Sequence, residues 1–165
     1  MLRNQAAKEM GRYLDNDFEW HADGTFTTQY FMSKKSARRL IENLHQVVQR
    51  KIGNLQLTTY WVAERGPFAD DYHLHALFSA DTKPDNLIAI IEDAWLKVSR
   101  TKRVQSENRF TVDPFEKGDG ACSYLTKQLS MREVDYDFIL PDSSLLLTNS
   151  NKEKDSIRCT RAIIA

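Results

Sequence analysis

Two runs of strand-forming residues, Leu55–Glu64 and Tyr72–Ser79, limit the possible folds of this chain more than any other part of the sequence. In the first run, successive side chains point alternately to the two faces of the predicted strand. In the second, His73 and His75 point to one face, while Leu74, Ala76 and Phe78 point to the other. The short Gly-Pro loop between the runs predicts an antiparallel hairpin. Such a hairpin brings Glu64, at the end of the first strand, close to both histidines.

Hydrophobic spacing elsewhere predicts four helices and four further strands. The helices are expected at Met1–Leu14, Lys34–Lys51 after an N-cap at Ser33, Pro84–Arg100 and Ala121–Ser130. The further strands are expected at Phe18–Trp20, Thr25–Phe31 after a turn at Ala22-Asp23-Gly24, Phe110–Val112 and Tyr136–Leu140. From the second of these strands on, the order strand, helix, strand, strand, helix, strand is that of a split β-α-β unit. We therefore predict an α+β fold, RRM-like, with helices packed on one face of a central antiparallel sheet.

The 165 residues suffice for one domain with a hydrophobic core and are too few for two. We expect residues 1–142 to form that domain, with an N-terminal helix within the first 17 residues, and the polar residues 143–165 to form a tail. No apolar run could span a membrane, no signal core opens the chain, and the two cysteines form no CxxC pair, so a cytoplasmic location is expected. The formal net charge is zero, so any nucleic-acid affinity has to come from local basic clusters.

His73 and His75 are candidate metal ligands, because side chains two residues apart on a strand lie about 7 Å apart on one face. With Glu64 as a third ligand, two imidazoles and a carboxylate suit Mn²⁺ or Mg²⁺ and leave positions open for a phosphate. Asp70 or Asp71 in the hairpin loop could replace Glu64 as the carboxylate. The alternative is that both histidines are structural residues of the strand, each satisfied by a neighbouring group.

Tyr124 and Lys127 form a Tyr-x-x-Lys pair on the last predicted helix, where residues three apart share a face. A phenol can attack a phosphodiester and hold the product as a phosphotyrosine, although a free phenol is a weak nucleophile at neutral pH. A metal ion that polarises the phosphate and a lysine that stabilises its oxygens both compensate for that weakness. On its own, such a pair is common and usually structural.

Together, Glu64, the strand His73-Leu74-His75 and the helix Tyr124-Leu125-Thr126-Lys127 resemble the HUH endonuclease superfamily. Within it, the sequence is similar to the single-tyrosine (Rep type) initiators of rolling-circle replication in plasmids, phages and small circular DNA viruses. That family carries a strand motif near its start, a His-hydrophobic-His motif with an acidic third ligand, and a Tyr-x-x-Lys motif. Here Thr25–Phe31 lies where the first motif is expected, and the similarity extends over about residues 18–140.

The resemblance implies a metal-dependent endonuclease and strand transferase that acts on single-stranded DNA, at an origin or nick site that can lie in a hairpin. His73, His75 and Glu64 would hold Mn²⁺ or Mg²⁺. Tyr124 would form a 5′-phosphotyrosine link and release a 3′-hydroxyl, and Lys127 would stabilise the phosphate or orient the ion. Attack by an incoming 3′-hydroxyl would rejoin a strand without ATP. The expected DNA contacts are aromatic, polar and basic side chains, namely Phe26, Thr28, Tyr30, Lys34, Lys35 and Arg109.

Other functions and partners remain open. The sequence contains no Gly-x-x-x-x-Gly-Lys loop, so unwinding of duplex DNA would need a host helicase, and extension a host polymerase. A transposase of the same superfamily would act as a dimer on a DNA hairpin. A non-catalytic module on an RRM-like sheet would instead bind nucleic acid through aromatic side chains on the exposed sheet face.

Four further residues are interpreted as lying outside the functional site. His21 and His45 are expected to be surface or helix residues rather than metal ligands. Cys122 is expected to be a small buried hydrophobic residue rather than a redox site. Tyr136 is a second tyrosine near the end of the domain, but its strand context makes it a poor nucleophile.

Overall fold

The computed structural model describes residues 2–66, 71–101, 109–118, 120–127, 129 and 134–141. Within these ranges the chain forms four helices and five strands. The helices are α1 (Leu2–Asp17), α2 (Lys34–Ile52), α3 (Leu87–Ser99) and α4 (Ala121–Lys127). The strands are β1 (Ala22–Phe26), β2 (Leu57–Arg65), β3 (Tyr72–Ala80), β4 (Phe110–Pro114) and β5 (Asp135–Ile139). No helix in this part of the chain is long and apolar enough to cross a membrane.

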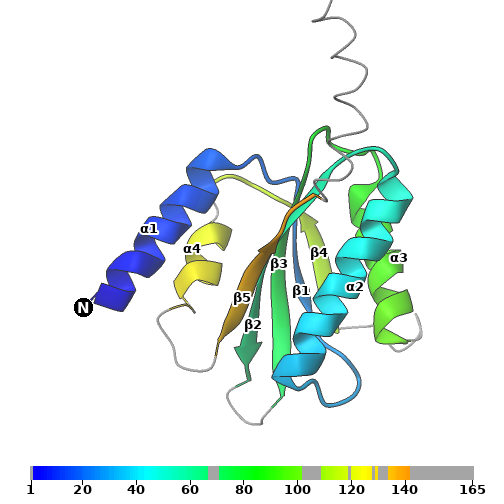
Figure 1. The fold of residues 1–165 in the computed structure, drawn as a ribbon, viewed down its shortest axis with the longest axis horizontal. Coiled ribbons are helices and arrows are strands. Elements are labelled where there is room, and N and C mark those ends of the chain that lie inside the picture. The colour runs from blue at the N-terminus through cyan, green and yellow to red at the C-terminus, as the bar shows by residue number, and fades with distance from the viewer. Residues whose placement is uncertain are drawn as a thin grey trace, which may run out of the picture.

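The five strands form one antiparallel sheet in the order β4-β1-β3-β2-β5. Its first four members make the split β-α-β arrangement, in which α2 connects β1 to β2 and α3 connects β3 to β4 (Figure 1). Strand β5 adds to the outer side of β2. The predicted α+β fold with a central antiparallel sheet is confirmed. The predicted hairpin is confirmed as well, and Glu64 of β2 is paired directly with His73 of β3.

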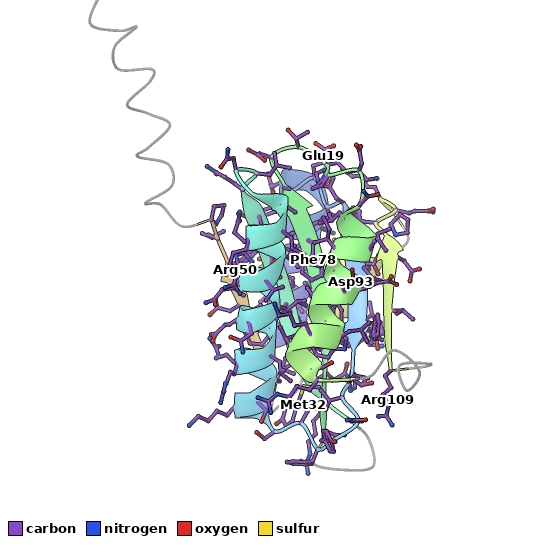
Figure 2. The ribbon with its side chains drawn as sticks, turned by 90° about the vertical axis from the view of Figure 1, so that its right-hand side faces the viewer. Glu19, Met32, Arg50, Phe78, Asp93 and Arg109 are labelled. Carbon is purple, nitrogen blue, oxygen red and sulfur yellow. The ribbon has the colours of Figure 1, made fainter. Side chains whose placement is uncertain are left out.

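Helices cover both faces of the sheet, so the expectation of a single covered face is wrong. Helices α2 and α3 lie side by side on one face (Figure 2), and α1 and α4 lie on the other (Figure 1). Strands β2 and β3 are the reason, because their central residues are buried on both sides. Trp61 and Phe78 belong to the core beneath α2 and α3, whereas Tyr60, Val62 and Leu77 belong to the core beneath α1 and α4. Because apolar side chains lie on both faces of the sheet, helices have to pack on both faces to bury them.

The first strand lies earlier in the chain than predicted. β1 comprises Ala22–Phe26, so the predicted turn at its start is wrong, and residues 27–31 lie outside any strand. Its residues pair with β3 on one side and with β4 on the other, and these backbone hydrogen bonds outweigh the turn preference of Asp-Gly. Phe18 and Trp20 form no strand either. Their rings stack at a centroid distance of 4.9 Å, and Trp20 Nε1 donates to the carbonyl of Leu14 in α1 (2.8 Å).

Helix α2 begins and ends where its local signals predict. Ser33 Oγ accepts a hydrogen bond from a backbone N–H of the first turn (3.2 Å), and Gly53 follows the helix with a positive φ of 69°. Arg38 of α2 donates to the carboxylate of Asp135 in β5 (2.9 Å) and lies over the ring of Trp61. These contacts of Arg38 hold the edge strand β5 against the sheet.

The other predicted elements are confirmed with small shifts at their ends. Helix α1 extends to Asp17, and α3 begins at Leu87 rather than Pro84. The predicted extension of α4 to Ser130 includes positions outside the described residues. The predicted tail 143–165 and most of the hairpin loop also lie outside them.

Candidate metal centre and nucleophile

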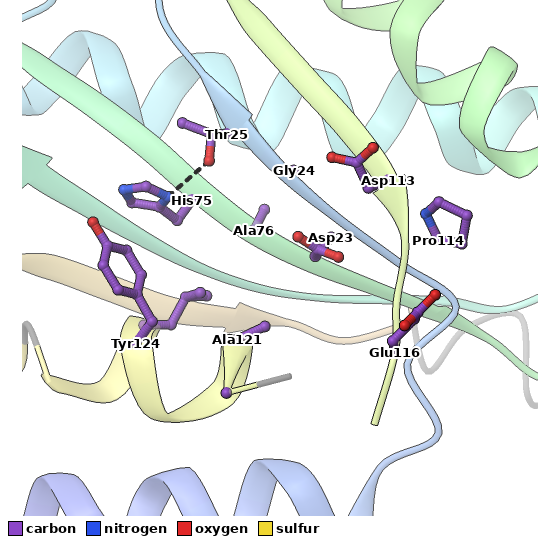
Figure 3. Close-up of a pocket in the computed structure, with 12 residues that line it drawn as sticks. Asp23, Gly24, Thr25, His75, Ala76, Asp113, Pro114, Glu116, Ala121 and Tyr124 are labelled. Carbon is purple, nitrogen blue, oxygen red and sulfur yellow. Dashed lines mark hydrogen bonds between the residues drawn. The ribbon is translucent and has the colours of Figure 1, made fainter. Parts of the chain in front are cut away.

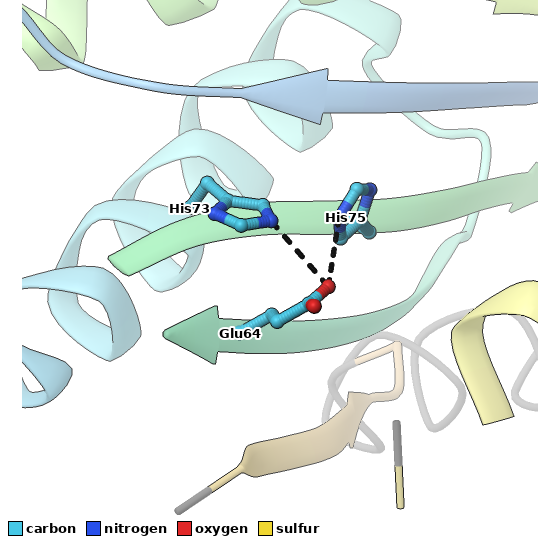
Figure 4. Close-up of side chains that lie close together, drawn as sticks. All are labelled: Glu64, His73 and His75. Atoms are coloured by element: carbon cyan, nitrogen blue, oxygen red, sulfur yellow. Dashed lines mark ion pairs between the residues drawn. The ribbon is translucent and has the colours of Figure 1, made fainter. Parts of the chain in front are cut away.

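Three potential metal ligands converge on the hairpin of β2 and β3. Glu64 and His73 are register partners, and His75 follows two residues later on the same face. Glu64 Oε2 lies 3.4 Å from His73 Nε2 and 3.5 Å from His75 Nε2 (Figure 4). One ligand atom from each residue lies within 4.8 Å of the others, so the group could hold a metal ion. The fold therefore brings together the three residues that the sequence singled out as ligands.

Thr25 on the neighbouring strand β1 orients the ring of His75. The two residues are register partners, and Thr25 Oγ1 lies 3.0 Å from His75 Nδ1 (Figure 3). We assign the ring proton to Nδ1, which donates to the hydroxyl oxygen. Nε2 then carries the lone pair on the side of Glu64 and His73, and this is the tautomer that a metal ligand needs.

The burial and charge of the group fit a divalent cation. Glu64 Oε2 and His75 Nε2 are buried and have no hydrogen-bond partner among the described residues. Burial, and secondarily the neighbouring His73, lowers the pKa of His75 to about 4, so its ring is neutral at pH 7. With the ring proton on Nδ1, His75 Nε2 and Glu64 Oε2 face each other with lone pairs, and buried lone pairs without a partner cost free energy. A cation between them would satisfy both.

The Thr25 contact yields a test of the ligand assignment. Replacement of Thr25 by valine keeps the side-chain shape but removes the acceptor that holds the His75 tautomer. We expect the Mn²⁺ affinity, measured by calorimetric titration, to fall about tenfold or more. Thr111→Val is the matched control, because Thr111 pairs with Thr25 from β4 on the other side and should leave the affinity unchanged. Equal affinities for wild type and Thr25→Val would contradict the assignment.

Tyr124 lies beside the metal-ligand group. Its ring centroid is 5.3 Å from that of His75, with the two rings nearly perpendicular, and its side chain is half exposed. Gly118 and Gly120 precede α4 with positive φ values of 94° and 82°, so the chain turns sharply into the helix. Lys127 is exposed at the last position of α4, one turn beyond Tyr124. The nucleophile candidate is therefore brought next to a candidate metal ligand from a distant part of the sequence.

A hollow of about 690 Å³ adjoins Tyr124 and His75 on the same face of the sheet (Figure 3). Residues of β1, β3 and α4 line one part of it, among them Thr25, His75 and Tyr124. Three carboxylates, those of Asp23, Asp113 and Glu116, line its other side (Figure 3). The hollow is large enough for a nucleotide next to Tyr124.

No family model, curated protein or solved structure matches this chain. The resemblance to HUH endonucleases therefore rests on the motif residues and on their arrangement in the fold. The described part of the chain brings Glu64, His73, His75 and Tyr124 to one face of the sheet.

The side chains predicted to contact DNA do not form one strand face. Phe26 is fully buried in the core beneath α2 and α3, so its predicted role as a DNA contact is wrong. Thr28 and Tyr30 lie in the loop after β1, where Tyr30 is 68% exposed. Arg109 Nη1 donates to the carbonyl of Thr28 (2.9 Å) and thereby holds this loop. The sequence reasoning missed Phe31, which is 64% exposed beside Tyr30.

The two predicted lysine contacts lie at the start of α2. Lys34 and Lys35 are both exposed, and Lys34 Nζ donates to the backbone carbonyl of Val134 (3.4 Å). The loop of Tyr30 leads directly into this helix, and the backbone N–H of Tyr72 donates to the carbonyl of Met32 (2.8 Å). The loop and the lysines therefore border the end of β3 that carries His73.

The remaining histidines and carboxylates are occupied elsewhere. His21 is buried rather than at the surface, and His45 is a helix residue, as expected, on the buried face of α2. His45 Nδ1 pairs with Thr59 Oγ1 (2.9 Å), and burial lowers the pKa of His45 to about 4. Neither belongs to the metal-ligand group, as predicted. Asp71 Oδ1 accepts a hydrogen bond from the backbone N–H of Met32 (2.6 Å), which leaves Glu64 as the carboxylate of the cluster. Asp70 lies outside the described residues.

Cys122 and the strand aromatics also bear on the alternatives. Cys122 is buried, as predicted, and burial raises the pKa of its thiol to about 11. Among the aromatic residues of the described strands, Tyr136 alone is strongly exposed. The sheet therefore offers little of the stacking surface that an RRM-like binding module uses.

Proposed function

We propose that this protein is a metal-dependent endonuclease and strand transferase that nicks single-stranded DNA through a phosphotyrosine intermediate. The observation that carries the proposal is the contact between Tyr124 and His75, because a candidate nucleophile lies beside a group that could hold a metal ion. The motif resemblance supports the initiation of rolling-circle replication as the biological role. Mn²⁺ or Mg²⁺ is the proposed cofactor, since one carboxylate and two imidazoles suit either ion.

The reaction is a transesterification at phosphorus. Tyr124 Oη forms a bond to the scissile phosphorus and loses its proton, while the bond from phosphorus to the 3′-oxygen breaks. The departing 3′-oxygen takes up a proton, so one P–O bond replaces another and no ATP is needed. A divalent ion held by the cluster would polarise the phosphate. Lys127 stabilises the charge on the phosphoryl oxygens, and attack by a free 3′-hydroxyl reverses the reaction and joins strands.

Single-stranded DNA fits the surroundings of Tyr124. Bases of an unpaired strand stack on exposed aromatic rings, and its phosphates follow basic side chains. Tyr30 and Phe31 offer the rings, and Lys34 and Lys35 the charge, at the end of the sheet that carries His73. The carboxylates of the hollow suit the amino group of a base rather than a phosphate.

The proposal is tested by trapping the intermediate. The full chain is incubated with Mn²⁺ and a random pool of single-stranded oligonucleotides labelled at either the 5′ or the 3′ end. We expect a covalent adduct that survives denaturant and retains the 3′ label, because a 5′-phosphotyrosine holds the downstream fragment. Duplex DNA of the same pool and EDTA-treated protein serve as controls and should give none. Absence of an adduct across the whole single-stranded pool would refute the proposed function.

A further inference from the structure

Helix α1 lies outside the split β-α-β unit and packs against α4, the helix that carries Tyr124 (Figure 1). In the described part of the chain α4 comprises seven residues, too few to be stable without tertiary contacts. Two of its buried side chains, Cys122 and Leu125, share a core cluster with Leu14 of α1. The position of α4, and with it the position of the Tyr124 ring, therefore depends on α1.

At Gly11, α1 lies directly against α4. A Cβ atom at Gly11 would lie 2.7 Å from Thr126 Oγ1 and 3.6 Å from the carbonyl oxygen of Cys122, whereas ordinary contacts of a Cβ atom are 3.4–4 Å. Gly11 is buried in a regular helix and has no positive φ. Glycine is therefore needed here for close approach and not for its backbone conformation.

Thr126 cannot simply turn away from an added methyl group. Its side chain is 1% exposed, and its Oγ1 donates to the carbonyl of Cys122 (2.9 Å). A methyl group at position 11 thus pushes on α4 as a whole. Helix α4 is short, whereas the strands of the sheet are hydrogen-bonded to one another, so the helix yields more easily than the sheet does.

We propose that α1 is a positioning element for the nucleophile, and that Gly11 sets the distance between Tyr124 and the metal-ligand group. This inference rests on the proposed function for its kinetic consequence, although the geometric part stands without it. Gly11 and Thr126 are both buried between the helices, so both act through the placement of α4. Any ligand or modification that displaced α1 would weaken cleavage without touching the metal ligands.

The kinetic test measures single-turnover adduct formation. Gly11→Ala should lower the rate constant about ten- to hundredfold, because a misplacement of about 1 Å is enough for such a loss. The affinities for Mn²⁺ and for the oligonucleotide should remain those of the wild type. The double variant Gly11→Ala/Thr126→Ala, which removes the clashing hydroxyl, should recover most of the rate. The single variant Thr126→Ala completes the double-mutant cycle. Arg12→Ala is the surface control, because Arg12 is the exposed residue next to Gly11 on α1.

A second readout is independent of cleavage. In protein labelled with 3-fluorotyrosine, the ¹⁹F resonance of Tyr124, assigned by its loss in Tyr124→Phe, reports on the packing of its ring against His75. We expect this resonance to shift in Gly11→Ala and to return in the double variant. An unshifted resonance or a wild-type adduct rate in Gly11→Ala would overturn the inference. A double variant whose adduct rate stays as low as that of Gly11→Ala would overturn it as well. A wild type without adduct, but with the expected shifts, would refute the proposed function and leave the positioning role supported.

Discussion

Replacement of Tyr124 by phenylalanine should eliminate the covalent DNA adduct. The substitution removes a single oxygen from a half-exposed ring, so the packing against His75 and the fold should both persist. Loss of a nucleophile removes the whole covalent pathway, and the expected fall in adduct formation is at least on the order of 10⁴-fold. The measurement is a denaturing gel of labelled oligonucleotide after incubation with Mn²⁺. Binding of the uncleaved oligonucleotide, followed by fluorescence anisotropy, should be nearly unchanged, because the hydroxyl contributes to chemistry rather than to stacking.

Tyr136→Phe is a closely matched control. Tyr136 is 47% exposed against 49% for Tyr124, and its pairing with Val62 places it on the same face of the sheet. This variant should form the adduct at the wild-type rate. A Tyr124→Phe protein that still forms the adduct would contradict the assignment of Tyr124 as the nucleophile. If the Tyr136→Phe protein then failed to form the adduct, Tyr136 would be the nucleophile instead.

Removal of the carboxylate from the metal-ligand group is expected to have the second largest effect. Glu64→Gln keeps the size of the side chain and deletes its charge, which leaves two imidazoles to hold the ion. We expect the Mn²⁺-dependent adduct rate to fall about 10²–10³-fold, since metal polarisation contributes several kcal/mol to such reactions. His73→Ala should have a comparable effect. Mn²⁺ affinity by calorimetry and adduct rate over a Mn²⁺ titration are the two measurements.

Unfolding can be separated from loss of the ion. Because Glu64 Oε2 is buried without a hydrogen-bond partner, its neutralisation should leave the metal-free protein as stable as the wild type, or more stable, by thermal denaturation. Asp113→Asn is the control for metal affinity: Asp113 is another carboxylate on this side of the sheet, lines the hollow and stands outside the cluster. A Glu64→Gln protein that binds Mn²⁺ as tightly as the wild type would rule out the site.

Periodic local patterns were sufficient to predict most of the framework. The apolar stripe and the Ser33 cap of α2 depend on residues within a few turns, and the alternation and short loop of β2 and β3 specify their hairpin. The proximity of Glu64 to His73 and His75 follows from that hairpin, which is why the metal-ligand group could be named from the sequence.

Other features depended on contacts between distant segments, which local patterns do not encode. The boundaries of β1 were predicted wrongly because pairing on both sides overrides the turn preference of Asp23-Gly24. Phe26 was predicted as a DNA contact because alternation identifies the two faces of a strand but not which face is buried. Thr25 could not be named as the partner of His75 until the register of β1 against β3 was known.

The chain alone was thus enough to nominate the chemistry: two imidazoles, a carboxylate, a phenol and a lysine at recognisable spacings. Whether these groups meet was a matter of tertiary packing. Helix α4 is too short to hold its own position, so the 5.3 Å between the rings of Tyr124 and His75 exists because α1 closes over the second face of the sheet and touches α4 at Gly11. The distance between side chains that are far apart in the sequence is set by how whole helices and strands pack together. The periodicity of residues within one helix or strand carries no information about that distance.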